Sequence, residues 1–347
     1  MGDMALGFAP GELVCGGRFR VVQVLAFGGM GDVYEVEDAH IGRRFVLKTL
    51  QRELAGDADL RRQMQREARV LGRIDHVNVV RVFTAGVTDD ADALPFIVME
   101  KLEGATLRQV LRAGTRVPAR AAVRATIDLL LALDHVHELG VVHCDLKPEN
   151  IFFHRDREGV TPKLLDFGVV RVLPRGEANV NRGGTIRYAS PEQIRGDGVG
   201  PRSDVYSMGL VLYEMIAGRG PFHDATGVAQ VARAQLTRTP PAIGGVPSGL
   251  MRLLSRALSK EPERRPRDAF AFARELRDVE PCLAGERSLD ASIIAARAKC
   301  DEPTRTREDV GDDDTLRDPT VRVSSRDLLT RHASGEGGGG RCDGFFP

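Results

Sequence analysis

The chain has 347 residues, 42% of them hydrophobic, which is enough for a sizeable core in one two-lobed domain or two ordinary domains. Its 49 basic residues balance 49 acidic ones, so the broad basic surface of a general nucleic-acid-binding protein is excluded. Scattered cysteines without metal-site spacing, no signal-peptide pattern and no segment apolar enough for a transmembrane helix predict a cytoplasmic protein with no membrane span.

The N-terminal part of the chain has the pattern of a small antiparallel sheet with one helix. Apolar and polar residues alternate at strand period, and a helical stripe then follows, formed by Met64, Ala68 and Leu71. The expected strands are residues 19–25, 33–36, 45–48, 79–85 and 96–99, and the expected helix is residues 57–73.

Beyond Glu103 the pattern becomes mainly helical. Pro118 begins a long amphipathic helix that we expect to end at Leu139. Further helices are expected over residues 203–217, 226–236, 248–258 and 268–278, with short strands at 141–142 and 163–165. The sequence therefore predicts an α+β fold whose small sheet and single main helix precede a larger, mainly helical part.

The composition changes after Pro281. The tail contains three consecutive aspartates at 312–314, a glycine run at 337–340 and few aromatic residues before Phe345-Phe346. Such a segment cannot bury enough apolar surface to offset the entropy lost on ordering, so the tail is predicted to be mostly disordered. One extra helix over residues 288–298 is compatible with the pattern.

Two features of the N-terminal part suit phosphate binding, but each is weak evidence for it when taken alone. Gly28-Gly29-Met30-Gly31 lies between two strands, where backbone N–H groups can approach phosphates because glycine has no Cβ atom. An ordinary hairpin turn has the same pattern. Lys48 ends a short strand, and a lysine there is usually only solvated.

The most specific signal is the octet His-Cys-Asp-Leu-Lys-Pro-Glu-Asn at residues 143–150, followed by Asp166-Phe167-Gly168. With this spacing the sequence resembles eukaryotic-type protein kinases, and the octet has the form of their serine/threonine-specific catalytic loop. Ser-Pro-Glu-Gln at residues 190–193 is similar to bacterial members of that family. The octet and the later triplet are very improbable as a chance match.

The resemblance extends over residues 18–279, and it implies the two-lobed protein kinase fold with lobes at 18–102 and 103–279 and a tail at 280–347. It implies an ATP- and Mg²⁺-dependent serine/threonine protein kinase of a bacterial signalling pathway, with Mn²⁺ as an alternative metal. Protein serines and threonines, including some of its own, are the implied substrates.

By the same resemblance, catalytic roles fall on Asp145, Lys147, Lys48, Glu67 and Thr185. Asp145 is expected to orient the substrate hydroxyl and accept its proton, and Lys147 to place positive charge beside the moving phosphate. Lys48 is expected to hold the α- and β-phosphates with Glu67 as its partner, while Thr185 supports Asp145. The implied metal ligands are Asn150 and Asp166, whose hard oxygens suit Mg²⁺. The implied nucleotide contacts are Leu25, Ala26, Phe27, Gly28, Gly29, Met30, Gly31, Val33, Val46, Lys48, Met99, Glu100, Leu102 and Phe152.

Further matches follow along the chain. Residues 184–192 resemble the substrate-docking loop with its anchor, and Arg265 is expected to pair with Glu192. The resemblance also predicts a stack of buried side chains, formed by Leu71, Val82, His143 and Phe167.

Some positions depart from the family pattern. Ala26 replaces a flap glycine, and Val46 and Phe152 are expected to narrow the adenine pocket. Cys144 replaces the arginine that would contact a phosphorylated activation loop, so activity is predicted not to depend strongly on phosphorylation there. Redox regulation at Cys144 is an alternative, although such a cysteine is more often just a small buried residue.

Partners and rival functions remain open at this stage. Threonines of the tail, at 304, 306, 315 and 320, are candidate autophosphorylation sites for a phosphothreonine-binding partner, against the simpler interpretation of a solvated linker. Pairing of small lobes into a homodimer is also left open. A pseudokinase acting as a nucleotide-binding scaffold and a small-molecule kinase are the rival functions, but the intact polar catalytic positions argue against the first. The substrate-docking loop argues against the second.

Overall fold

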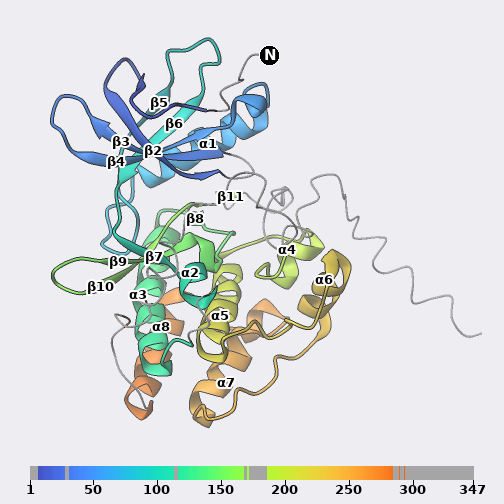
Figure 1. Ribbon diagram of the computed structural model, residues 1–347. Coiled ribbons are helices and arrows are strands. Elements are labelled where there is room, and N and C mark those ends of the chain that lie inside the picture. Colours follow the sequence, from blue (N-terminus) through green and yellow to red (C-terminus); the bar gives the residue numbers. More distant parts are fainter. Residues whose placement is uncertain are drawn as a thin grey trace, which may run out of the picture.

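The computed structural model describes residues 7–27, 31–112, 116–167, 170–171 and 186–283, together with Leu289 and Ile293. Figure 1 shows a lobe rich in strands above a larger helical lobe. Within those residues, no helix has both the length and the apolar character needed to cross a membrane. The predicted disorder of the tail and the extra helix at 288–298 fall almost entirely outside the described part.

The small lobe is built on one six-stranded antiparallel sheet. Its strands run in the order β1-β2-β3-β4-β6-β5. They are β1 (Leu13–Val14), β2 (Phe19–Phe27), β3 (Gly31–Asp38), β4 (Arg44–Leu50), β5 (Val82–Val87) and β6 (Pro95–Glu100). Because β4 pairs with β3 on one side and β6 on the other, Lys48 is held in the interior of the sheet, opposite Val33 and Ile97.

Helix α1 (Ala58–Leu71) packs against β5 and β6 of this sheet. The Asp57 side chain begins the helix by accepting hydrogen bonds from the backbone N–H groups of Asp59 and Leu60. Met64 and Leu71 are buried, as their helical spacing predicts. Glu67 is buried beside them, which a carboxylate tolerates only with a partner.

The large lobe surrounds two long helices. Its helices are α2 (Leu107–Arg112), α3 (Ala119–Glu138), α4 (Pro191–Arg195), α5 (Pro201–Ala217), α6 (Gly227–Thr237), α7 (Ser248–Ala257) and α8 (Ala269–Val279). Its strands are β7 (Gly104–Thr106), β8 (Val141–Val142), β9 (Ile151–Arg155), β10 (Val160–Leu164) and β11 (Val170–Arg171). Helix α3 packs against both α5 and α8.

Helix α5 is the centre of the large lobe. Pro201 occupies its first turn, and Gly218 ends it at a φ of 75°, a left-handed conformation that favours glycine. Residues 203–216 are all buried, so α5 has no solvent-facing stripe. A helix buried on every side provides a fixed base for the loops that lie on it.

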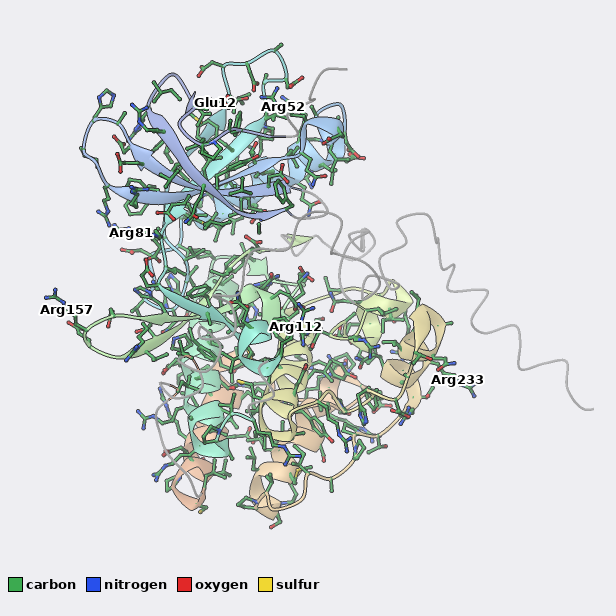
Figure 2. The ribbon with its side chains drawn as sticks, viewed as in Figure 1. Glu12, Arg52, Arg81, Arg112, Arg157 and Arg233 are labelled. Carbon is green, nitrogen blue, oxygen red and sulfur yellow. The ribbon has the colours of Figure 1, made fainter. Side chains whose placement is uncertain are left out.

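Charged side chains point to solvent on the outer surface of the large lobe. Figure 2 shows Arg157 at the tip of the β9–β10 hairpin and Arg233 on α6, both directed away from the body. Beyond α8, Glu280 accepts a hydrogen bond from Arg120, at 2.6 Å, and Ile293 is buried.

The predicted α+β, two-lobed fold is confirmed, and each predicted helix within the described residues is present. The structure adds short elements that the pattern did not predict, including α2, α4, β7 and β9.

Candidate active site

A cluster of three charged side chains joins the two lobes. The Lys48 ammonium on β4 lies 3.0 Å from Glu67 Oε1 on α1 and 2.8 Å from Asp166 Oδ1, in the loop after β10. Sheet register places Lys48, and the helical stripe that buries Met64 and Leu71 turns Glu67 toward it. Residues more than a hundred positions apart therefore meet at one ammonium group.

Two influences set the pKa values in this cluster: burial, and the presence of two carboxylates beside a single lysine. Burial opposes the charged form of Lys48, but Asp166 and Glu67 outweigh it and raise the pKa of the ammonium. Burial, together with the nearby charge of Asp166, raises the pKa of Glu67 despite the attraction of Lys48. The charge of Lys48 overcomes the partial burial of Asp166 and lowers the pKa of that carboxyl. Asp166 thus stays ionised, and added positive charge beside it would favour ionised Glu67 as well.

The loop of residues 143–150 is held by bonds among its own polar groups. Asn150 Nδ2 donates to the Asp145 backbone oxygen at 2.8 Å and to Asp145 Oδ2 at 3.0 Å. Lys147 Nζ lies 2.8 Å from the same Oδ2 atom. The backbone N–H of Leu165 donates to the oxygen of Asn150 at 2.8 Å, which fixes this loop beside Asp166.

The Asp204 carboxylate holds this loop by hydrogen bonds to its backbone, a role that sequence reasoning missed. Its buried carboxylate accepts the backbone N–H groups of His143, at 2.8 Å, and Cys144, at 2.9 Å, and lies 2.8 Å from His137 Nε2. Because it lies at the start of the buried helix α5, it ties the loop to the centre of the lobe. Nothing in the local pattern around Asp204 identifies these partners.

Cys144 lies in the left-handed region, with a φ of 61°. Its backbone N–H is bound by Asp204, and its backbone oxygen accepts a hydrogen bond from Gln193 Nε2 at 2.8 Å. The backbone of Cys144 therefore joins the loop to α4. A larger side chain is not required for this link.

In the predicted stack of buried side chains, the two central members, His143 and Phe167, are in contact. The rings of His143 and Phe167 lie 4.5 Å apart, centroid to centroid. Leu71 is buried, and Val82 is half-buried against the same core. Burial lowers the pKa of His143, so the imidazole stays neutral near pH 7.

One buried ion pair and one half-buried pair join elements of the large lobe. As predicted, Arg265 pairs with Glu192, through Nη1 at 2.7 Å and Nη2 at 2.8 Å. Sequence reasoning missed the second pair, in which Arg108 of α2 contacts Glu149 at 2.8 Å, Glu214 at 3.1 Å and the Tyr188 hydroxyl at 2.6 Å. Helix α2 is too short for its periodicity to indicate this role.

The predicted nucleotide contacts lie on both sides of the segment that links the lobes. Val46 of β4 is opposite Met99 of β6, and Glu100 ends β6 just before Leu102. Phe152 lies on β9 in the other lobe, where it pairs with Thr106. Val33 is on β3, with Gly31 at the start of that strand; Leu25, Ala26 and Phe27 are exposed at the end of β2. Gly28, Gly29, Met30 and Thr185 lie outside the described residues.

The side chains proposed as metal ligands have suitable chemistry. Asp166 offers a carboxylate that is 44% exposed, so a metal ion can reach it from the solvent. In Asn150 the amide nitrogen is engaged by Asp145, which leaves the amide oxygen for another partner. Carboxylate and amide oxygens are ligands that Mg²⁺ and Mn²⁺ accept.

Comparisons with known proteins agree with this geometry. Residues 19–276, more than half of the chain, match the family described as "Protein kinase domain". Serine/threonine-protein kinase pkn2 of Myxococcus xanthus is 36% identical over 287 residues, covering 80% of this chain and 34% of that protein. Serine/threonine-protein kinase PknB of Mycobacterium tuberculosis is 34% identical over 325 residues, covering 88% of this chain and 51% of that protein.

The solved structures give the same result. The kinase domain of PknI from Mycobacterium tuberculosis is similar with a TM-score of 0.62 and 25% identity, covering 80% of this chain and 100% of the PknI chain. The chain thus corresponds to a whole solved domain of this kind, but spans only 34% and 51% of the two curated relatives.

Proposed function

The chain belongs to the protein kinase domain family, and we propose that it transfers the γ-phosphate of ATP to serine and threonine hydroxyls of proteins. Members of this family use ATP and a divalent metal. The observation that carries the proposal is the meeting of Lys48, Asp166 and the Asp145 loop at one place between the lobes. A scaffold without catalysis would have no need for these side chains to be held in such an arrangement.

Positioning and electrostatics supply most of the catalysis of phosphoryl transfer, because the transition state is loose and its charge is spread over phosphate oxygens. Lys48, held by Glu67 at 3.0 Å, is in place to bind the phosphates of the nucleotide. Asp166 and Asn150 would hold Mg²⁺, with Mn²⁺ as the alternative, and the metal would neutralise charge on the phosphates.

Asp145 is the proposed base. Asn150 and Lys147 fix its carboxylate from two directions, so that it orients a substrate hydroxyl and accepts its proton. The ammonium of Lys147 adds positive charge beside the phosphate in transit. Thr185 is proposed to support Asp145 on the substrate side.

Adenine is proposed to lie against Val46, Met99 and Phe152, with the backbone of Glu100 to Leu102 as its hydrogen-bonding edge. The glycines at 28, 29 and 31 are proposed to cover the phosphates, with Met30 among them. The remaining proposed contacts on this side are Leu25, Ala26, Phe27 and Val33.

The test is transfer of labelled phosphate from ATP to a generic basic protein in the presence of Mg²⁺. We expect labelled phosphoserine and phosphothreonine, and loss of the label with Asp166→Asn, which retains the shape of the side chain but removes its charge. Arg157→Asn is the matched control, because its side chain lies on the exposed β9–β10 turn. Nucleotide binding without any transfer would instead favour the scaffold.

The partners of the chain are also proposals. Thr304, Thr306, Thr315 and Thr320 are proposed autophosphorylation sites that a phosphothreonine-binding partner reads, and two small lobes are proposed to pair in a homodimer. Phosphopeptide mapping after incubation with ATP tests the first proposal, and sedimentation over a range of protein concentrations tests the second.

A further inference from the structure

Lysine is scarce in this chain, and one of its lysines differs from the others in its surroundings. The sequence contains six, at positions 48, 101, 147, 163, 260 and 299. Lys299 lies outside the described residues. In the part of the chain that the structure describes, the first four each have a carboxylate oxygen within 3.0 Å, whereas Lys260 has no ion pair.

The ammonium of Lys260 is surrounded by aromatic rings instead of carboxylates. Lys260 Nζ donates to the Tyr206 hydroxyl at 2.9 Å, and it lies 5.3 Å from the ring centre of Tyr206 and 4.9 Å from that of Phe222. Burial raises the pKa of the Tyr206 hydroxyl, so this partner stays neutral. The ammonium therefore has a hydrogen-bond acceptor but no negative charge beside it.

The charged groups around these rings are mainly positive. Arg265 lies over the Tyr206 ring at 4.8 Å, and its terminal nitrogens already hold Glu192. Arg238 lies over the Phe222 ring at 5.5 Å, and it pairs with Asp224. Arg195, at the end of α4, is exposed and has no ion pair among the described residues. The nearby acids are thus engaged by arginines, and none is left for Lys260.

These surroundings make the amine of Lys260 reactive. Burial, together with the positive charges of Arg265 and Arg195, lowers the pKa of Lys260 to about 8. About a quarter of such amines are unprotonated at pH 7.5, against roughly one in a thousand for an ordinary lysine. A less basic group attacks more slowly, as thiols do, so the expected net advantage in rate is ~10-fold.

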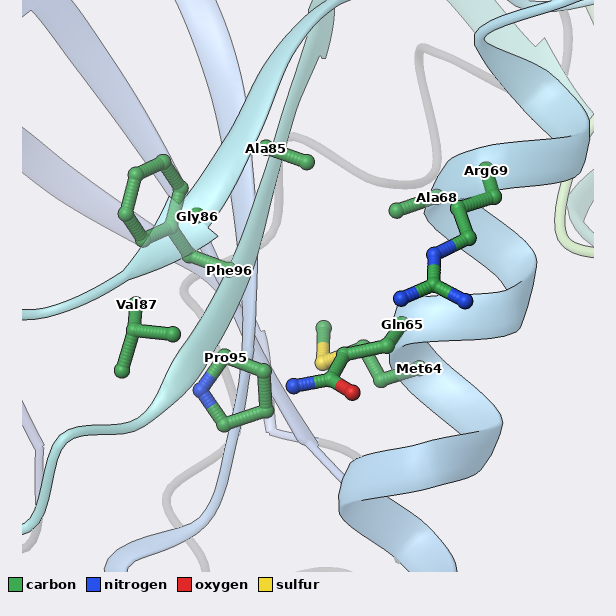
Figure 3. A pocket seen from close by; sticks show the side chains of 9 residues that line it. All are labelled: Met64, Gln65, Ala68, Arg69, Ala85, Gly86, Val87, Pro95 and Phe96. Carbon is green, nitrogen blue, oxygen red and sulfur yellow. The ribbon is translucent and has the colours of Figure 1, made fainter.

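The hollows of the small lobe offer no competing amine. The hollow between α1, β5 and β6, of about 290 Å³, has no lysine in its lining, as Figure 3 shows. A second hollow, of about 190 Å³, includes Lys163, but Glu100 lies 2.7 Å from that ammonium. Lys260 is therefore the described lysine best suited to act as a nucleophile.

The positive charge around Lys260 also selects the donor. A guanidinium without a partner, such as that of Arg195, attracts phosphate. An acyl phosphate carries its negative charge on the group that leaves, so the same charge that keeps the amine neutral also favours the approach of this donor.

We propose that Lys260 is a modification site, whose amine takes the acyl group of a small acyl phosphate such as acetyl phosphate. The nitrogen attacks the carbonyl carbon and a C–N bond forms. The C–O bond to phosphorus-bound oxygen breaks, and inorganic phosphate leaves with that electron pair. The amine proton passes to the solvent, and the product is an uncharged amide.

A chain of hydrogen bonds connects Lys260 to the predicted substrate-docking loop. The Tyr206 hydroxyl, which accepts from Lys260, donates to Gln235 Oε1 at 2.6 Å. The Gln235 amide in turn donates to the backbone oxygen of Arg187, within that loop. Acylation removes the charge of Lys260 and two of its three N–H donors, and it adds volume to a half-buried site. The contact with Tyr206 cannot then keep its present geometry.

The direct test maps acetylation over time in the full chain, incubated with acetyl phosphate at pH 7.5 and analysed by peptide mass spectrometry. We expect Lys260 to react ~10-fold faster than Lys101, the matched control, which is less deeply buried but lies 2.9 Å from Glu35. Equal rates at these two lysines, or a rate at Lys299 that matches that of Lys260, would overturn the proposal.

The pH profile separates a reactive amine from one that is merely accessible. The rate at Lys260 should level off above about pH 8, because most of the amine is then unprotonated. The rate at Lys101 should continue to rise through pH 9, since the hydrogen bond from its ammonium to Glu35 raises the pKa of Lys101. Parallel profiles at the two lysines would contradict the proposal.

The choice of donor has its own test. Arg195→Gln should slow acetylation of Lys260 by acetyl phosphate several-fold, because it removes the charge that favours both the neutral amine and the donor. Arg157→Gln, on the exposed β9–β10 turn, is the matched control and should leave the rate unchanged. Faster labelling by acetyl-coenzyme A than by acetyl phosphate at equal concentration would contradict the proposed donor.

The effect on phosphate transfer rests on the proposed kinase function. Lys260→Gln should raise KM for a protein substrate several-fold and change KM for ATP by less than about 2-fold. Lys260→Arg should make transfer insensitive to acetyl phosphate. Equal changes in the two KM values would contradict the link to Arg187. Acetylation of Lys260 as predicted in a protein without phosphate transfer would refute the kinase function alone, and transfer without this acetylation would refute the modification site alone.

Discussion

Replacing Arg265 by methionine breaks a buried ion pair of the large lobe. The Arg265 side chain is 0% exposed, and its two terminal nitrogens hold Glu192 at 2.7 and 2.8 Å. The same guanidinium donates to the backbone oxygens of Ser259, Arg202 and Lys260. Methionine fills much of the volume but leaves the Glu192 carboxylate buried, with the Ser203 hydroxyl as its remaining side-chain donor.

Removing one partner of a buried pair typically costs about 3–5 kcal/mol, because the other charge stays buried without compensation. For a domain of this size we therefore expect the melting temperature to fall by roughly 6–20 °C. Denaturant titration at pH 7 measures the free energy directly. Arg264→Met is the matched control, since the neighbouring side chain is 76% exposed, and it should change stability by less than ~0.5 kcal/mol.

The pH dependence gives a second check on the same pair. Burial opposes ionisation of Glu192, but the hydrogen bonds and charge of Arg265 outweigh it and lower the pKa of the carboxyl. A lowered folded pKa contributes stability above the unfolded pKa of about 4.3, and that stability is lost as the pH falls through the folded value. The difference between wild type and Arg265→Met should thus shrink below about pH 4. A loss under ~1 kcal/mol at pH 7, or an equal loss for Arg264→Met, would refute this reasoning.

Three further predictions concern the active site. Lys48→Met should lower kcat/KM for ATP by about 10²–10³-fold through loss of a phosphate-binding charge, measured by steady-state kinetics, while Arg44→Met on the same strand leaves it nearly unchanged. Burial lowers the pKa of His143, so stability should fall as the pH drops below about 6.5; His143→Tyr should flatten this part of the profile in denaturation experiments from pH 7 to pH 5. Phosphatase treatment should change activity by less than about 2-fold, because residues 168–184 contain no serine or threonine and Cys144 lacks a guanidinium; a large loss would contradict this.

The sequence predicts most of the fold because its longer segments have clear periodicity. Helix α1 and the long helix α3 lie within a few residues of their expected bounds, since their apolar stripes are regular. Strand β9 and helix α2 were missed because each is short and lacks a distinct pattern. Propensity alone carries little information over five or six residues.

The candidate site likewise contains residues that the sequence predicts and residues that it does not. The resemblance to protein kinases singled out Lys48, Asp145 and Asp166, and the structure brings them to one place. The partners of Asp204 and Arg108 could not be predicted, because they depend on packing between segments that are distant in the chain. Ser190, which looks like a loop serine in the sequence, proves to be the buried cap of α4, so its replacement would test folding and not phosphorylation.

The most direct test of the account compares wild type with Asp145→Asn at matched protein, ATP and Mg²⁺ concentrations. The substitution removes the proposed base, but Asn150 and Lys147 remain, and the shape of the side chain is nearly unchanged. We predict that nucleotide binding, measured by thermal shift, stays within a few-fold of wild type, while transfer of labelled phosphate to protein serine and threonine falls by at least ~10²-fold. Undiminished transfer by a folded Asp145→Asn protein would contradict the assignment of Asp145 as base, and with it the central claim.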